Sequence, residues 1–257
     1  MWAKASAIKM RKLAAVLACR NNSARLYGKP LQNLDTRKGI SILDQLISLL
    51  KTVPPINEIV LAISEGPHNT AFIDYAEKNH FVYIIGDEEN MLVRLILGAE
   101  KVNATDIFRV TTECPFIMFE KIQEAWKLHI KENNDATFLD NVVVGANFEI
   151  VTLAAMKKSH EKGNERHRSE YSTLYIREHS QDFKIKQLEV PQEYMRNDIR
   201  LTGDTPEDLI VLRAIYKEFS NLAPKIPLKK IIAFMDRNPG LLKLIAPLCK
   251  KSIITCL

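Results

Sequence analysis

The chain has 257 residues, 46% hydrophobic and 26% charged, which is enough to bury the core of one large α/β domain, the arrangement we favour, or of two small ones. Its formal net charge of +5 is modest against 36 basic and 31 acidic residues, and this balance fits the handling of anionic small molecules. The sequence has no long basic run and no apolar stretch of roughly 20 residues, so neither nucleic acid binding nor membrane insertion is expected.

The cysteines and the first residues of the chain indicate the cellular compartment of the protein. Cys19, Cys114, Cys249 and Cys256 are scattered without Cys-x-x-Cys spacing, which favours neither a zinc site nor a disulfide framework. The start of the chain is basic and then apolar, but the apolar run is short and passes directly into Arg20, unlike a signal peptide. We therefore expect a cytoplasmic protein.

Residues 13–19 are predicted to form a central buried strand of the fold. This apolar run has the length and the small or branched residues of a strand buried on both faces, and it stops at Arg20. The following loop supplies cations, side-chain donors and a glycine: Arg20, Asn21, Asn22, Ser23, Arg25, Gly28 and Lys29. In mostly parallel sheets, ligands bind beyond the carboxyl ends of the strands, so the loop is predicted to bind a polyphosphate. The alternative is a solvated basic loop.

Alternating strands and helices predict the architecture of the first half. The expected helices span residues 39–53, 69–78, 91–102 and 120–129, and the further strands span 58–63, 81–85 and 106–110. This cadence is typical of a parallel sheet covered on both faces, a three-layer, doubly wound α/β fold.

The second half has a different rhythm. Short extended stretches at residues 136–139, 148–152 and 183–188 surround a polar segment at 157–172, and we expect this part to leave the main sheet. The chain is predicted to return at 199–202 and to form a helix over 205–219, begun by Thr205. Two further amphipathic helices, 228–237 and 240–250, form a C-terminal cap within residues 222–257.

Two acidic residues follow predicted strands, Glu113 in TTECP and Asp204 in RLTGDTPEDL. A bound nucleoside triphosphate would need Mg²⁺, which usually takes one or two protein carboxylates together with phosphate oxygens. The two acids can meet if their strands are neighbours. Alternatively, Asp204 supports the start of the next helix and Glu113 lies in a surface turn.

Several further polar residues have more than one interpretation. Arg109 lies in an otherwise apolar strand, so it either pairs with a carboxylate such as Glu113 or faces a ligand phosphate. Arg94 lies either on a solvated helix face or against the ligand. His167 and His179 are expected to be exposed on a helix, without a catalytic role.

These segments together resemble a known family. The run ACRNNSARLYGKPL resembles the substrate loop of the cytidylyltransferases that activate sugar acids, the CMP-KDO and CMP-sialic acid synthetases, and in particular of their relative, the spore coat polysaccharide biosynthesis SpsF group. The matching loop positions are Arg20, Ser23, Arg25, Leu26, Gly28 and Lys29. The resemblance continues through GDEENMLVR, FRVTTECPFI, ANFEIVTLAAM, RSEYSTLYIREH and RLTGDTPEDLIVLRAIY.

The resemblance implies a GT-A-like nucleotidyltransferase that joins CTP to an anionic acceptor and releases pyrophosphate, for surface glycan or related conjugate biosynthesis. It assigns Glu113 and Asp204 to Mg²⁺, and Ala62 and Ser64 to the region of the base. It also implies that residues 140–180 form part of a homodimer interface and of the acceptor site. The triphosphate would contact Arg20, Asn22, Ser23, Arg25 and Lys29, and the acceptor side would include Arg94, Arg109, Glu149 and Glu170.

The sequence departs from the family pattern at several positions. Tyr27 replaces a usual proline, Thr112 a glycine, Glu113 an aspartate and Tyr171 a histidine. Two other functions stay open beside the cytidylyltransferase: a glycosyltransferase of the same fold, although no Asp-x-Asp metal motif is present, and a non-catalytic nucleotide-binding protein.

Overall fold

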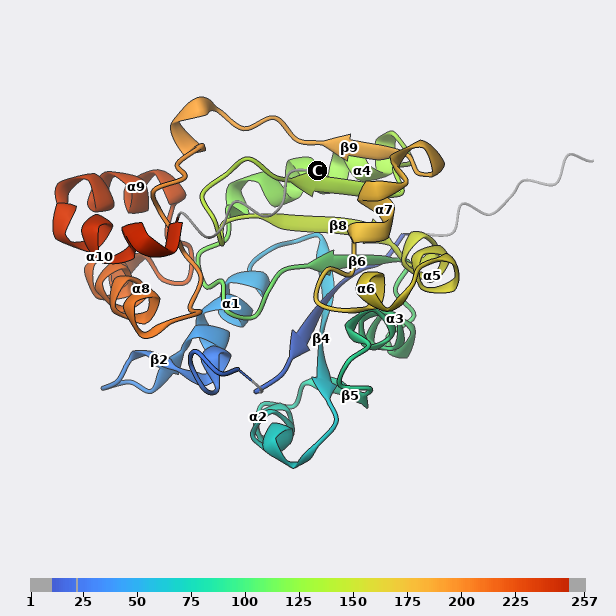
Figure 1. The fold of residues 1–257 in the computed structure, drawn as a ribbon, viewed down its shortest axis with the longest axis horizontal. Coiled ribbons are helices and arrows are strands. Elements are labelled where there is room, and N and C mark those ends of the chain that lie inside the picture. Colours follow the sequence, from blue (N-terminus) through green and yellow to red (C-terminus); the bar gives the residue numbers. More distant parts are fainter. Residues whose placement is uncertain (1–10, 22, 250–257) are drawn as a thin grey trace, which may run out of the picture.

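A seven-stranded sheet with helices on both faces forms the centre of the computed structural model, which describes residues 11–21 and 23–249 (Figure 1). The strand order is β5-β4-β1-β6-β8-β7-β9, and β8 alone runs opposite to the other strands of this sheet. The strands are β1 Leu13–Cys19, β4 Ile56–Ser64, β5 Val82–Gly86, β6 Asp106–Arg109, β7 Ala136–Leu139, β8 Phe148–Thr152 and β9 Ile185–Gln187. A separate hairpin, which the sequence pattern missed, pairs β2 Asn33–Asp35 with β3 Ile40–Ser41.

Helices connect these strands. The α-helices are α1 Ile42–Leu50, α2 Thr70–Lys78, α3 Met91–Lys101, α4 Ile122–Lys131, α5 Leu153–Lys162, α6 Glu165–Arg168, α7 Leu174–Glu178, α8 Pro206–Phe219, α9 Leu228–Arg237 and α10 Pro239–Cys249. Short 3-10 helices lie at Lys29–Leu31, Pro67–Asn69, Phe119–Lys121, Ser180–Asp182, Gln192–Tyr194 and Ser220–Leu222. Within the described ranges, none of the helices combines the length and apolar character needed to cross a bilayer.

Several helices begin at a side-chain cap. Ser41 and Asp44 form a reciprocal capping box at α1, and Thr205 and Asp208 form another at α8. Asn90 caps α3 by accepting a hydrogen bond from the Val93 N–H. These caps fix where each connecting loop ends, and so they fix the loops that surround the carboxyl ends of the strands.

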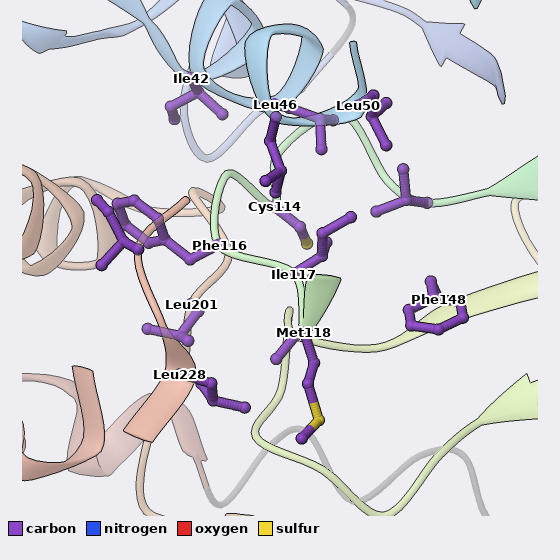
Figure 2. Close-up of a cluster of buried hydrophobic side chains, with 14 of the residues drawn as sticks. Ile42, Leu46, Leu50, Cys114, Phe116, Ile117, Met118, Phe148, Leu201 and Leu228 are labelled. Atoms are coloured by element: carbon purple, nitrogen blue, oxygen red, sulfur yellow. The ribbon is translucent and has the colours of Figure 1, made fainter. Parts of the chain in front are cut away.

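The strand β1 separates two hydrophobic cores. Its side chains alternate, so Leu13, Ala15 and Leu17 pack in the larger core with α1 and α8, whereas Ala14 and Val16 pack against α3. Figure 2 shows part of the larger core, where Ile42, Leu46 and Leu50 of α1 face the segment from Cys114 to Met118. On the other face, a Cβ added to Gly98 would lie 2.6 Å from Val16 Cγ1, so glycine lets α3 approach β1 closely.

The expectation that the middle of the chain leaves the sheet is wrong. β8 pairs antiparallel with β6, β7 pairs with β8, and β9 adds to β7, so all three short strands extend the main sheet. The polar segment at 157–172 is largely helical. The segment 199–202, which was expected to return to the sheet, makes only an isolated bridge between Val144 and Arg200. The chain then bonds to the loop after β6, where Gly203 N and Glu113 O lie 2.9 Å apart.

A buried ionic network closes the end of β6 farthest from the carboxyl ends of the strands. Asp106 and His129 are fully buried, and His129 Nε2 lies 3.1 Å from Asp106 Oδ1. Arg11 Nε donates to Asp106 Oδ2 at 2.9 Å. Burial alone would raise the pKa of Asp106, but hydrogen bonds from His129, Arg11 and Thr105 outweigh it and hold that pKa below its usual value. Burial lowers the pKa of His129 and outweighs the opposing effect of Asp106.

We predict that His129 makes the protein less stable in mild acid. An unfolded histidine takes up a proton below its ordinary pKa of about 6.5, whereas buried His129 resists protonation, so lowering the pH favours the unfolded state. In urea titrations, the loss of unfolding free energy between pH 7 and pH 5 should be smaller in His129→Gln than in the wild type. His80→Asn, which changes an exposed histidine, should keep the wild-type loss. An equal loss in wild type and His129→Gln would contradict the prediction.

Candidate active site

A cavity of about 1090 Å³ lies at the carboxyl ends of β1 and β6. Loops from distant parts of the sequence form its wall, because parallel strands present these ends at one edge of the sheet. The wall includes the predicted site residues Arg20, Ser23, Arg25, Lys29, Arg94, Arg109, Glu113, Glu170 and Asp204. Asn22, the remaining polar candidate of the loop after β1, lies outside the described residues.

The carboxylate of Asp204 joins three cationic side chains. Lys29 Nζ donates to Asp204 Oδ1 at 2.7 Å, and Arg25 Nη2 lies 3.4 Å from the same oxygen. Arg200 Nη2 lies 3.2 Å from Oδ2. Burial would raise the pKa of Asp204, but the hydrogen bond and charge of Lys29, with the charges of Arg25 and Arg200, hold it below the usual value. Asp204 is therefore a carboxylate at neutral pH.

The start of α8 does not need the carboxylate of Asp204. Asp208 Oδ2 accepts hydrogen bonds from the backbone N–H groups of Asp204 and Thr205, at 3.2 and 3.1 Å, and Thr205 caps the helix. Because these two residues complete the capping box, the Asp204 side chain is left in the cavity wall. The helix-capping alternative for Asp204 is therefore wrong.

The second acid, Glu113, lies beside Asp204. The backbone bond from Gly203 N to Glu113 O holds the two loops together, and Thr112 Oγ1 donates to Ala18 O at 3.2 Å, which fastens the Glu113 loop to the end of β1. Burial and the charge of Asp204 raise the pKa of Glu113, while Lys29 opposes this shift. Glu113 and Asp204 thus lie close together beside the basic loop, although the segment before Asp204 makes only an isolated bridge and is not the neighbouring strand on which their expected meeting depended.

This acidic pair fits a magnesium ion that is completed by a nucleotide. Mg²⁺ requires oxygen ligands and is commonly held by one or two carboxylates together with substrate phosphates. Burial is the main cause that raises the pKa of Glu113, and a cation between Glu113 and Asp204 would offset the lesser cause, the charge of Asp204. Among residues 11–21 and 23–249, no cluster of three or more His, Cys, Asp or Glu side chains could hold a metal ion, so the protein alone offers an incomplete shell.

Arg109, which also lines the cavity, is held by Glu149. Arg109 Nη1 donates to Glu149 Oε2 at 2.9 Å, and Nη2 donates to Glu170 O at 2.9 Å. Glu113 had been suggested as a possible carboxylate partner of Arg109, and this pairing is wrong. β8 runs antiparallel to β6, and its register places Glu149 directly opposite Arg109. Glu149 is only 5% exposed and lies outside the cavity wall.

Sequence reasoning missed Arg177 and Asp140. Arg177 donates to Asp140 Oδ2 at 2.7 Å and to Glu149 Oε1 at 2.8 Å, and its guanidinium lies 3.7 Å from the centre of the Phe138 ring. Burial would raise the pKa of Glu149, but the charges of Arg109 and Arg177 outweigh burial and lower it. In the sequence, the only indication that Arg177 has a role was its position in the family-like run RSEYSTLYIREH.

Other expected positions differ from the structure. Ala62 and Ser64 are buried in β4 and do not line the cavity, because the strand continues through Ser64 and Ala62 packs in the α3 core. His167 is 6% exposed and bonds to Glu178 Oε2 at 2.8 Å, so its predicted exposure is wrong. His179 is half-buried and stacks on Tyr175 with ring centres 4.0 Å apart. Neither histidine lines the cavity.

The fold and the basic, acid-bearing cavity define an α/β protein of the nucleotidyltransferase class. The model of the cytidylyltransferase family matches residues 14–239, and the chain therefore belongs to this family. The resemblance seen in the sequence motifs is confirmed.

Two relatives are similar to most of the chain. An uncharacterized protein of Methanocaldococcus jannaschii is 28% identical over 89% of this chain and 92% of its own. The spore coat polysaccharide biosynthesis protein SpsF of Bacillus subtilis is 27% identical over 90% and 96%.

The solved structures support the fold. A cytidylyltransferase from Leptospira borgpetersenii serovar Hardjo-bovis superposes with a TM-score of 0.80 at 22% identity, over 90% of this chain and 97% of that one. A CMP-2-keto-3-deoxy-manno-octonic acid synthetase complexed with CTP gives a TM-score of 0.59 at 15% identity, over 81% and 99%. The expected fold of a nucleotide-sugar-type transferase, with a mostly parallel sheet between helices, is confirmed.

We predict that Glu149→Gln lowers the free energy of unfolding by about 3–5 kcal/mol, the usual cost of breaking a buried ion pair. The substitution leaves Arg109 without its carboxylate partner in a buried setting. Chemical denaturation at neutral pH measures the effect. Glu124→Gln, which breaks the more exposed pair with Lys121, should change the unfolding free energy by less than about 1 kcal/mol. Equal effects of the two substitutions would show that Glu149 contributes no more than a surface charge.

Proposed function

We propose that this protein transfers the cytidylyl group of CTP to an anionic small-molecule acceptor and releases pyrophosphate. The observation that carries the proposal is the convergence of Lys29, Arg25 and Arg200 on Asp204, next to Glu113, in one cavity. Membership of the cytidylyltransferase family supports the reaction class. The CTP complex of a structural neighbour supports CTP as the nucleotide.

The cations of the basic loop would bind the triphosphate. Lys29 and Arg25 now share Asp204, and they would exchange this carboxylate for phosphate oxygens when a nucleotide enters. Glu113 and Asp204 would hold Mg²⁺, which neutralises charge on the triphosphate when bound. Arg200 is fixed between Asp204 and Asp208, so it keeps the Asp204 carboxylate oriented during this exchange.

The transfer requires no nucleophile from the protein. An acceptor oxygen forms a bond to the α-phosphorus, and the bond to the β-phosphate breaks, with its electron pair leaving on pyrophosphate. Burial raises the pKa of Cys19, and it raises that of Cys114 to about 12, so both thiols are protonated and unreactive at neutral pH. The residues of the cavity would therefore align the reactants and neutralise charge.

The proposal extends to the setting of the reaction. The B. subtilis relative is named for spore coat polysaccharide biosynthesis, which supports a surface glycan or related conjugate as the destination of the product. The acceptor would be a sugar acid, a sugar phosphate or a similar oxyanion. We also propose a cytoplasmic homodimer in which residues 140–180 contribute to the interface.

We predict pyrophosphate release when the protein is incubated with CTP, Mg²⁺ and a panel of anionic acceptors. Asp204→Asn and Lys29→Ala should each reduce this rate by about 10²–10³-fold, because the first removes a carboxylate that would hold Mg²⁺ and the second removes a cation that would bind the triphosphate. Asp74→Asn, at an exposed position of α2, should keep the wild-type rate. A fully active Asp204→Asn enzyme would contradict the proposed site. Release of nucleoside diphosphate from a sugar nucleotide, with none of pyrophosphate from CTP, would indicate a glycosyltransferase instead.

We predict that CTP binding measured by calorimetry strengthens with Mg²⁺ and that Glu113→Ala raises the Mg²⁺ concentration at half-effect by about tenfold, equivalent to about 1.4 kcal/mol. Glu113→Asp should stay within about threefold of the wild type, because it keeps a carboxylate at this position. CTP binding that is indifferent to Mg²⁺ would contradict the metal assignment.

A further inference from the structure

The excess positive charge of the chain is concentrated in its C-terminal cap, residues 222–257. This cap carries seven of the 36 basic residues but only one of the 31 acidic residues, Asp236, so the rest of the chain is slightly acidic. Arg196, which lies outside the cap, forms an ion pair of 2.8 Å with Asp236 and neutralises it. The cap is therefore a local cationic region on a protein whose other charges nearly balance.

The cations of the cap lie at the surface. The exposed ones are Lys225, Lys229, Lys230, Arg237 and Lys243. Within the described residues, only Lys229 among these five has an ion-pair partner, Glu193, at 3.8 Å. Both side chains of that pair are exposed, so the pair contributes little. The positive charge of the cap is thus available to an external anionic partner.

The helix α9 presents its charges on one face. Its exposed positions recur with the helical period, and they are Lys229, Lys230, Ala233, Asp236 and Arg237. Its remaining apolar side chains pack in the larger core: Leu228, Ile231, Ile232, Phe234 and Met235. Figure 1 shows α9 and α10 together at one end of the molecule, beside α8. The charged face of α9 therefore belongs to an end of the molecule that points away from the sheet.

The helix α10 adds apolar surface beside these charges. Among its residues Pro239–Cys249, only Lys243 is charged and only Ile245 is buried. Its leucines are half-buried, and Ala246 and Pro247 are exposed. The match to the family model ends at residue 239, where α10 begins, so this apolar helix is not part of what the chain shares with that model.

We propose that the C-terminal cap binds the surface of a membrane that contains anionic phospholipids. Lysine and arginine side chains close to such a surface are attracted to the headgroups, and partly exposed leucines add apolar contact at the boundary with the acyl chains. Sites for single-stranded nucleic acid instead combine cations with aromatic side chains that stack on the bases. The only aromatic residue of the cap, Phe234, is buried, and this favours lipid.

This proposal concerns where the protein acts, so it goes beyond the proposed reaction and does not depend on it. Leu248 and Cys249, at the end of α10, line the cavity. Attachment through the cap would therefore keep the cavity close to the membrane surface, and the product of the enzyme would be released there.

Cosedimentation of the full chain with lipid vesicles tests the proposal. At about 0.1 M salt, vesicles of phosphatidylcholine with about 30% phosphatidylglycerol should bind the protein at least about tenfold more tightly than vesicles of phosphatidylcholine alone. Raising the salt to about 0.5 M should weaken this binding, because a higher ionic strength screens the charges.

Reversing the charge of the cap should remove most of this affinity. The triple variant Lys229→Glu, Lys230→Glu, Lys243→Glu should bind the anionic vesicles at least about tenfold more weakly than the wild type. All three lysines are exposed, so the variant should keep the wild-type unfolding temperature. Ala246→Glu, at an exposed position of α10, places one carboxylate on the same surface and should weaken binding by about threefold or more.

A matched variant controls for net charge. Lys78→Glu, Lys127→Glu, Lys131→Glu makes the same change with exposed lysines of α2 and α4, and its affinity for the anionic vesicles should stay within about threefold of the wild type. An equal loss of affinity in the two triple variants would overturn the proposal, as would a wild type that ignores the anionic vesicles. A wild type that binds polyuridylate RNA but no vesicle would also overturn it.

Failure of this proposal can be told apart from failure of the proposed function. The three lysines of the cap variant lie outside the cavity wall, so its pyrophosphate release in solution should equal that of the wild type. If the protein binds anionic vesicles through the cap but releases no pyrophosphate from CTP, the membrane site stands and the proposed reaction fails. If it releases pyrophosphate but does not bind the vesicles, the reaction stands and the membrane site fails.

Discussion

The structure depends on one shared carboxylate, that of Asp204. Lys29 and Arg25 come from the loop after the first strand, whereas Arg200 and Asp204 come from the segment before α8, near the other end of the chain. Attraction among these charges draws the two segments together at the edge of the sheet, and Glu113 is held beside them by the backbone. The same contacts that close the fold therefore assemble the residues that we propose bind the triphosphate.

Much of this arrangement could be predicted, because its signals are local. The apolar run at residues 13–19 is β1, and the basic loop, Glu113 and Asp204 each follow directly where a strand or extended segment ends. Parallel strands bring such ends to one edge, which places the basic loop near Glu113, whereas Asp204 reaches Glu113 through the backbone bond from Gly203 N to Glu113 O. The helix cap at Thr205 could also be predicted, since Pro206 and Asp208 follow it at the expected spacing.

The incorrect predictions concern which strands pair and which side chains are buried, and no local sequence pattern encodes either property. The strand character of residues 148–152 was visible, but its antiparallel position beside β6 was not, and this position decides that Arg109 pairs with Glu149 rather than Glu113. Burial of Arg94 and His167 depends on helices packed over them from elsewhere in the chain. Ala62 was expected near the base but lies in the core. Pairing with the neighbouring strands β1 and β5 extends β4 past this residue.

The reversed direction of β8 limits how this region of the chain can change. The residues that precede β8, 140–147, are tied to other segments: Val143 N–H donates to Tyr194 O at 3.0 Å, and Val144 O accepts from Leu201 N–H at 2.7 Å. A change in the length of this loop would break these contacts. A single-residue insertion or deletion inside β8 would instead turn Glu149 toward the opposite face and leave two guanidinium groups without their common counter-charge. The loop before β8 and the strand itself are therefore both held to their present lengths, the loop by backbone hydrogen bonds and the strand by the ion pairs of Glu149.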